Sequence, residues 1–340
     1  TSTAIVAVRI AEILHQAAIL PAGALQLIAG GAGALLDQLG AEDVLAFTGS
    51  SDTAEVLRRH PAVQQRGTRL NVEADSLNAA ALGPDGEAGS EVYDLFIGDV
   101  VRDVSQKAGQ KCTAIRRIFV PRDRLAEVAA ELVDRIGALR VGDPSDEAVQ
   151  VGPVATRAQL AAVRAGIAEL AAVPGMTTLV GGAERPKLHA GLSDRGYFVA
   201  PTLFRCDDPS APQHPVHRME VFGPVATVMG YGDAAELVSL LRRGGGSLVA
   251  SLYSDDRALV PTVVRGAGAS HGRIFLGSGR LSGQSPGPGT VLPQLNHGGP
   301  GRAGDGQELG GVRGLQLYMQ RCAVVGYRPT VEALLPRPPA

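Results

Sequence analysis

Residues 105–114 read SQKAGQKCTA and lead directly into an apolar, strand-like run at 115–120. The stretch places a single cysteine, Cys112, behind a glycine turn and ahead of a strand, where substrate can reach a thiol. Lys111 beside it favours the thiolate, which is the nucleophilic form of cysteine. Free cysteines also serve often as small buried hydrophobic side chains. The stretch therefore offers a candidate nucleophile, with a purely structural cysteine as the alternative.

A strand-to-helix turn lies upstream, at FTGSS of residues 47–51. It follows a strand expected at 44–47 and precedes a helix expected at 52–59. Backbone N–H groups at such a helix start can hold a phosphate group. The turn is therefore a candidate phosphate site.

Two acidic residues have sequence contexts that suit chemistry. Glu73 ends an apolar, strand-like pattern, which makes it a candidate general base, with an internal salt-bridge partner as the alternative. Glu220 and Phe222 stand in MEVFGPV, next to a Gly-Pro turn that leads into a strand. Turn capping for Glu220 and ordinary core packing for Phe222 are the structural alternatives.

Strand and helix patterns alternate along the chain, which predicts an α/β fold with a parallel sheet. Helices are expected at 4–18, 35–39, 52–59, 124–139, 156–171, 234–243 and 257–267, and strands at 25–29, 44–47, 115–120, 225–231 and 247–253. Residues 277–293 are predicted to form a mobile loop.

Taken together, the motifs resemble the aldehyde dehydrogenase superfamily from residue 1 to about 327. Within it, the chain is most similar to the dehydrogenase half of the bifunctional ring-opening proteins of phenylacetate catabolism. Four segments carry this resemblance: VEADSLN at 72–78, KAGQKCTAIRR at 107–117, HGGPGRAGDGQELGG at 297–311 and YMQR at 318–321.

The resemblance implies a mechanism and a cofactor, NADP or NAD. Cys112 is the nucleophile and Glu73 activates water. Glu220 binds the nicotinamide ribose and Phe222 packs near the nicotinamide, while Gly49 and Ser50 contact the pyrophosphate. His297, in the glycine-rich segment, is expected either to contact substrate or to order its loop.

The resemblance also implies a domain plan. Residues 1–72 are the remainder of a Rossmann-type cofactor domain, 73–316 the catalytic domain, 317–327 a strand that bridges subunits of a homo-oligomer, and 328–340 a proline-rich tail. Compared with the family, the cofactor lysine and the oxyanion-hole asparagine would precede residue 1. We expect no hydratase activity.

The expected substrate is an aldehyde, in particular a semialdehyde carried as a coenzyme A thioester from aromatic-ring catabolism. A single-function semialdehyde–coenzyme A dehydrogenase of benzoate catabolism is the nearest enzymatic alternative. The others are a catalytically silent assembly partner and a cofactor-independent esterase that uses Cys112 and Glu73.

Composition excludes several classes of function. A net charge of −2 without an aromatic-spaced basic patch argues against nucleic-acid binding, and the apolar stretches are too interrupted to predict a membrane span. Three cysteines and no recognisable signal peptide predict a cytoplasmic protein. His214 and His217 lack a second ligand pair in zinc spacing, so we expect no metal.

Overall fold

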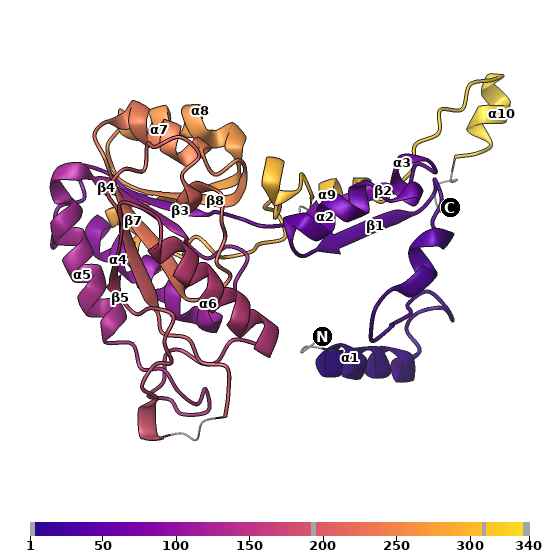
Figure 1. Ribbon diagram of the computed structural model, residues 1–340. Coiled ribbons are helices and arrows are strands. Elements are labelled where there is room, and N and C mark those ends of the chain that lie inside the picture. The colour runs from indigo at the N-terminus through magenta and orange to yellow at the C-terminus, as the bar shows by residue number, and fades with distance from the viewer. Residues whose placement is uncertain (1–3, 192–194, 308–310, 336–340) are drawn as a thin grey trace.

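The computed structural model describes residues 4–191, 195–307 and 311–335. Its main body is a sheet covered by helices, and an N-terminal arm, residues 4–73, extends away from this body (Figure 1). The helices are α1 (Ala4–Ala17), α2 (Ser51–Arg58), α3 (Pro61–Gln64), α4 (Glu91–Ser105), α5 (Leu125–Gly137), α6 (Arg157–Ala171), α7 (Ala234–Arg242), α8 (Leu259–Ala267), α9 (Val312–Gln316) and α10 (Arg328–Glu332).

The main body is organised by a seven-stranded sheet with the order β5-β6-β7-β4-β3-β8-β9. All neighbouring strands run parallel except β5, which is antiparallel to β6. Its strands are β3 (Ala79–Leu82), β4 (Arg117–Pro121), β5 (Met176–Val180), β6 (Thr202–Cys206), β7 (Val225–Tyr231), β8 (Ser247–Tyr253) and β9 (His271–Gly277). The arm holds a separate parallel pair, β1 (Val44–Thr48) and β2 (Arg69–Glu73). The predicted α/β class with a parallel sheet is confirmed.

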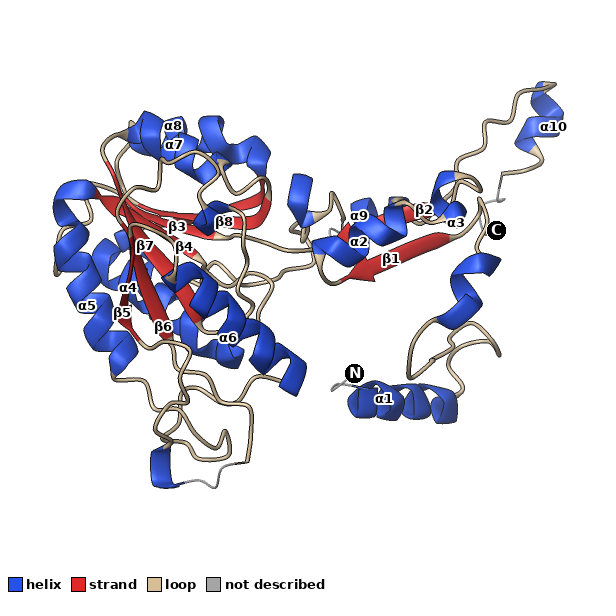
Figure 2. Ribbon diagram, viewed as in Figure 1, coloured by secondary structure: helices blue, strands red, loops and turns tan. Residues whose placement is uncertain are grey.

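Helices cover both faces of the large sheet, with α4 and α5 on one side and α7 and α8 on the other (Figure 2). The central strand β3 shows how the two cores meet. Ala80 and Leu82 pack toward α4 and α5, whereas Ala79 and Ala81 pack toward α7 and α8. A parallel strand buried on both faces is uniformly apolar, which is why β3 is built of alanine and leucine alone.

Some local expectations differ from the structure. Residues 25–29 form no strand, because these exposed residues have no neighbouring strand with which to pair. Residues 320–327 are likewise an exposed irregular segment in the single chain, so their role as a bridging strand stays a prediction. The proline-rich tail includes α10, and its residues 336–340 lie outside the described part. The loop predicted at 277–293 contains a 3₁₀ turn, η7 (Gly279–Gln284).

The predicted helices and strands of the catalytic region correspond closely to α5 to α8, β4, β7 and β8, with ends that differ by two residues or fewer. Within the described ranges, no helix combines the length and the apolar character needed to cross a bilayer.

One buried arginine forms hydrogen bonds between strand β4 of the sheet and the backbone of neighbouring segments. Arg117 of β4 is fully buried, and its guanidinium donates to the backbone carbonyl oxygens of Leu77 (3.0 Å), Leu240 (3.0 Å) and Leu241 (3.1 Å). It also contacts Nδ1 of the buried His217 at 3.1 Å, while His217 Nε2 lies 2.9 Å from the carbonyl oxygen of Pro209. This arrangement suits a neutral imidazole that donates from Nε2 and accepts at Nδ1.

Acid should therefore destabilise the fold through His217. Burial, together with Arg117, lowers the pKa of His217 to about 3. The unfolded chain binds this proton near pH 6.5, so the free energy of unfolding falls as pH decreases from 6.5 toward 3, by up to about 1.4 kcal/mol per pH unit. Urea unfolding at a series of pH values should show a shallower acid slope for His217→Gln. The matched variant at the exposed His15, His15→Gln, should keep the wild-type slope, and an equal slope for His217→Gln would contradict this account.

Candidate active site

The backbone at Cys112 is held in place by the side chain of Asn78. It lies in the connection between the 3₁₀ turn η2 (Gln106–Gly109) and β4. The side-chain amide of Asn78, just before β3, donates to the carbonyl oxygens of Cys112 (2.7 Å) and Ala114 (3.0 Å). The Asn78 oxygen in turn accepts from the backbone N–H of Val249 in β8 (2.9 Å). Two central strands of the sheet therefore fix the backbone at the cysteine.

The turn before Cys112 has an unusual backbone. Lys107, Ala108 and Gly109 all have positive φ, at 53°, 52° and 68°. Such conformations are costly for residues other than glycine and concentrate at functional sites. The strain is supported by Arg116, which is buried and donates to the carbonyl oxygens of Gly109 (2.8 Å) and Gly223 (2.7 Å).

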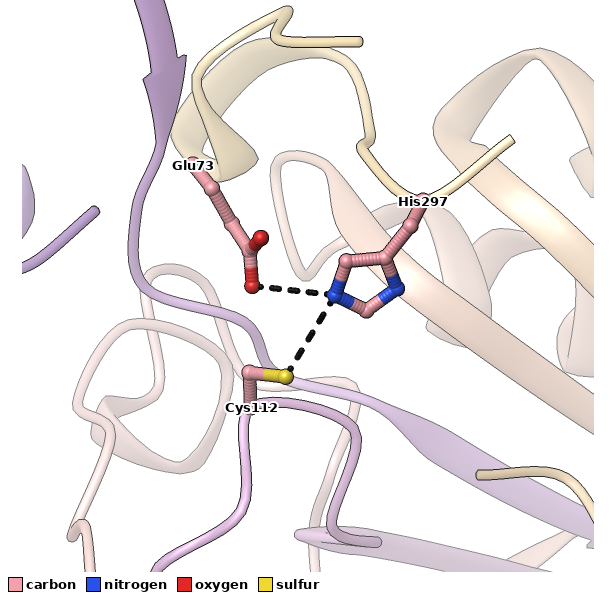
Figure 3. Close-up of side chains that lie close together, drawn as sticks. All are labelled: Glu73, Cys112 and His297. Atoms are coloured by element: carbon pink, nitrogen blue, oxygen red, sulfur yellow. Dashed lines mark hydrogen bonds and ion pairs between the residues drawn. The ribbon is translucent and has the colours of Figure 1, made fainter. Parts of the chain in front are cut away.

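Three side chains from distant parts of the chain meet at this turn (Figure 3). Nε2 of His297 lies 3.5 Å from Sγ of Cys112 and 3.2 Å from Oε1 of Glu73. Glu73 and His297 are buried, at 3% and 7% exposed, and Cys112 is partly exposed. The interactions with Cys112 and then with Glu73 raise the pKa of His297 to about 10, although burial acts in the opposite direction. The site therefore favours an imidazolium between sulfur and carboxylate.

The cationic group in contact with the sulfur is this histidine, whereas the Lys111 ammonium is engaged with other partners. Lys111 Nζ is ion-paired with the buried Asp103 at 3.1 Å and also contacts Gln106. The predicted effect of Lys111 on the thiolate is therefore offset by Asp103.

The turn at residues 47–51, the predicted phosphate site, lies next to Glu73 because β1 and β2 pair. Thr48 of β1 is in register with Glu73 of β2, and the Gly49 N–H donates to the Glu73 carbonyl oxygen at 3.0 Å. Ser50 is the N-cap of α2. The carboxylate of Asp75 already accepts from the backbone N–H and the hydroxyl of Ser51. A pyrophosphate bound at the start of α2 would therefore have to share the Ser51 N–H with the Asp75 carboxylate or displace that carboxylate.

Glu220 and Phe222 are brought to the cysteine turn from the opposite side. Glu220 Oε1 pairs with Arg116 at 3.4 Å and its Oε2 accepts from the Ser76 N–H at 3.0 Å, which leaves further lone pairs on both oxygens. Burial raises the pKa of Glu220, and the Arg116 charge opposes this. Phe222, 38% exposed, has the Arg116 guanidinium 5.5 Å from its ring centre and lines an open cavity of about 590 Å³.

The structure thus brings Glu73 to Cys112 through His297, and it brings Glu220 and Phe222 to the cysteine turn through Arg116. Gly49 and Ser50 lie at the end of β1, beside the backbone of Glu73. Sequence reasoning gave no role to Asn78, Arg116 or Asp75. Asn78 and Arg116 do lie within the segments that carry the family resemblance, but their contacts depend on the fold and no spacing rule reveals them. His297 appeared in sequence only as a substrate contact or a loop residue.

The same three side chains are of types found in metal sites, but a metal on Nε2 of His297 would have to displace the proton that its contacts with Cys112 and Glu73 favour. Glu73, Cys112 and His297 each offer one donor atom, all within 4.8 Å of one another. Carboxylate oxygen, thiolate sulfur and imidazole nitrogen are ligands that Zn²⁺ accepts. The expectation of no metal therefore stays a prediction.

Comparisons with known proteins identify the family of the chain. The aldehyde dehydrogenase family model matches residues 1–321. The 3,4-dehydroadipyl-CoA semialdehyde dehydrogenase of Aromatoleum evansii is 43% identical over 302 residues, covering 88% of this chain and 58% of the relative. Protein MaoC of Klebsiella aerogenes is 45% identical over 161 residues, covering 47% of this chain and 46% of the relative.

Solved structures show the same fold. Betaine aldehyde dehydrogenase of Staphylococcus aureus superposes with a TM-score of 0.78 at 25% identity, covering 92% of this chain and 57% of that one. An aldehyde dehydrogenase C variant of Pseudomonas syringae, crystallised with NAD⁺ and octanal, gives 0.77 at 28% identity, covering 92% and 59%. The chain spans about half the length of the relatives it matches. By sequence and by fold, it belongs to the aldehyde dehydrogenase family.

Proposed function

We propose that this protein oxidises an aldehyde to the corresponding acid, with Cys112 as the nucleophile and NADP or NAD as the hydride acceptor. One observation carries the proposal: the Cys112 thiol, on a strained and well-anchored turn, faces the buried Glu73 carboxylate across His297. A nucleophile, a carboxylate base and a group that orients them are the parts that covalent catalysis at a carbonyl requires.

The chemistry proceeds in two halves. The Cys112 thiolate adds to the aldehyde carbon, forming a C–S bond, and the Cys112 backbone N–H would stabilise the oxygen anion. Loss of hydride from that carbon leaves an acyl thioester on sulfur. Glu73 then accepts a proton from water as the water attacks the thioester carbon, the C–S bond breaks and the acid departs.

The candidate cofactor residues are Glu220 and Phe222, near the cysteine turn, and the Gly49–Ser50 turn, beside the backbone of Glu73. The exposed face of Phe222 and the remaining lone pairs of Glu220 fit a nicotinamide and its ribose, whereas the Gly49–Ser50 turn fits a pyrophosphate less directly because Asp75 lies at α2. When bound, the nicotinamide supplies the acceptor for the hydride.

The substrate we propose is a semialdehyde linked to coenzyme A. The name of the Aromatoleum evansii relative supports this class. A cavity of about 320 Å³ next to the cysteine turn is lined by three cationic residues, Arg102, Lys107 and Lys111, which suits phosphate groups. Arg102 and Lys111 are ion-paired, whereas Lys107 has no ion-pair partner among the described residues. Lys107 is therefore the cation most available to a ligand.

Charge reversal at this position should separate substrates. We expect Lys107→Glu to raise KM for a coenzyme A-linked semialdehyde by about 10-fold, because an attraction for phosphate becomes a repulsion, while KM for an unlinked aldehyde changes little. Lys187→Glu, at an exposed position away from the cysteine turn, is the matched control. An equal effect on both aldehydes, or no effect on either, would argue against coenzyme A at this cavity.

The reaction itself is tested by following reduced-cofactor absorbance. The purified protein is mixed with NADP⁺ or NAD⁺ and then with a semialdehyde thioester, an aliphatic aldehyde or an aromatic aldehyde. An aldehyde-dependent rise in absorbance is expected with at least one pair. No rise with any combination would refute aldehyde oxidation by this protein.

A further inference from the structure

The segment that carries His297 is bonded directly to the strand that carries Glu73. The Ala74 N–H donates to the Ala303 carbonyl oxygen at 3.0 Å, and the Gln307 N–H donates to the Asn71 side-chain oxygen at 2.8 Å. These two contacts lie on either side of Glu73 along the chain. The segment that follows His297 is therefore anchored to the chain on both sides of Glu73.

A single nitrogen of His297 serves both partners. Nε2 is the atom within 3.5 Å of the Cys112 sulfur and also the atom within 3.2 Å of Glu73 Oε1. If Nε2 carried no proton, its lone pair would face a carboxylate oxygen at hydrogen-bond distance, which is unfavourable. A proton on Nε2 turns both contacts into attractive, charge-assisted ones.

We propose that His297 is a third catalytic residue, which converts Cys112 to the thiolate by taking its proton on Nε2 and holding that proton between sulfur and Glu73. The role of His297 in turnover rests on the proposed aldehyde oxidation, whereas its effect on the ionisation of Cys112 can be measured without any aldehyde.

The proton transfer balances within these three side chains. The S–H bond of Cys112 breaks, its electron pair stays on sulfur, and the proton forms the Nε2–H bond of His297, whose Nδ1 already carries a proton, so that the ring becomes an imidazolium. The Glu73 carboxylate stabilises this cation. When Glu73 must act as a base on water, the proton on Nε2 can return to sulfur as the acyl group leaves, so no outside donor is needed.

Other charges also act on the sulfur and have to be separated from the effect of His297. The Arg116 and Arg273 guanidinium groups interact electrostatically with Cys112. The neighbouring Lys111 is paired with Asp103. All of these charges remain when His297 is replaced, so a difference between wild type and variant reports the histidine.

The test is the pH dependence of Cys112 alkylation by iodoacetamide, read from the mass of the peptide that contains Cys112. In the wild type, alkylation should persist well below the pH at which an ordinary thiol, of pKa about 8.5, loses its reactivity. In His297→Gln, the profile should move toward that ordinary value, with a rate near pH 6.5 lower by about 10-fold or more. His189→Gln is the matched control and should behave as wild type.

A second measurement does not depend on how the His297 variant folds. Thiolate absorbance is taken as the difference between the wild type and Cys112→Ala across the same pH range, and it should already be present near neutral pH. Added imidazole should partly restore alkylation in His297→Ala.

An unchanged alkylation profile in a folded His297→Gln, or a thiolate signal that appears only near the ordinary thiol pKa, would overturn the proposal. Neither measurement uses aldehyde or cofactor. A protein that fails to oxidise aldehydes can therefore still show the effect of His297 on Cys112, and a protein that oxidises aldehydes can lack it.

Discussion

Replacing Cys112 by alanine should reduce aldehyde-dependent reduction of NADP⁺ or NAD⁺ by about 10³-fold or more, because no covalent intermediate can then form. The side chain is partly exposed and packs at the edge of a small cluster of buried residues, Leu248, Val249 and Ala303, so the fold should survive the change. Steady-state rates, with circular dichroism to confirm folding, make the measurement.

The other two cysteines provide the controls. Cys322 is exposed, so Cys322→Ala should leave the rate unchanged. Cys206 is buried in the core between the sheet and α7, where its loss should affect stability before chemistry. Burial raises the pKa of Cys206 to about 11, which keeps it a thiol at neutral pH. A rate that survives in Cys112→Ala but falls in either of the others would contradict the assignment of the nucleophile.

The second large effect is expected at the glycine three residues before the cysteine. Gly109 has a φ of 68°, and a Cβ there would lie 2.1 Å from the carbonyl oxygen of Gly223. Gly109→Ala must therefore displace the backbone of either the cysteine turn or the segment of Phe222. We expect a loss of about 3 kcal/mol or more in the free energy of unfolding, since left-handed strain and steric overlap add.

A matched glycine distinguishes this from a general effect of alanine. Gly98 is exposed in the middle of α4, and a Cβ there meets nothing within 4 Å. Gly98→Ala should leave stability unchanged or raise it by about 0.5–1 kcal/mol, because alanine favours the helix. Urea unfolding of the two variants tests the pair. Similar stabilities for both would show that the close approach of Gly109 to Gly223 does not constrain the turn.

Helices and strands whose apolar residues follow a clear pattern along the chain were predictable from the sequence. The strands β7 and β8 are largely apolar runs, and the helices α5 to α8 have apolar residues at helical spacing, even where α6 and α8 contain glycine or proline. Strand β3 was missed because three alanines and one leucine show no particular hydrophobic period, and only the two cores packed on it make it a strand. The expected strand at 25–29 failed for the opposite reason, since an apolar run without a neighbouring strand cannot form a ladder.

The site was predictable only in its separate parts. Cys112 and Glu73 stood out because each follows or precedes a strand in a suitable context. The contact of Cys112 with His297 joins residues 185 positions apart, and the bond between Asn78 and the Cys112 carbonyl joins residues 34 apart. Sequence spacing holds no information on such contacts, because they arise when β2, β3 and the 297–307 segment pack together.

The most direct test of the central claim is the mass of the protein trapped during turnover. Glu73→Gln removes the base needed for hydrolysis, so the acyl group should accumulate on sulfur when aldehyde and NADP⁺ or NAD⁺ are added. The account predicts that the peptide containing Cys112 gains the mass of the aldehyde less two hydrogen atoms, because hydride has left the carbon and a proton has left the thiol. Reduction of the cofactor without any adduct on that peptide, or an adduct of the full aldehyde mass only, would contradict oxidation through a Cys112 thioester.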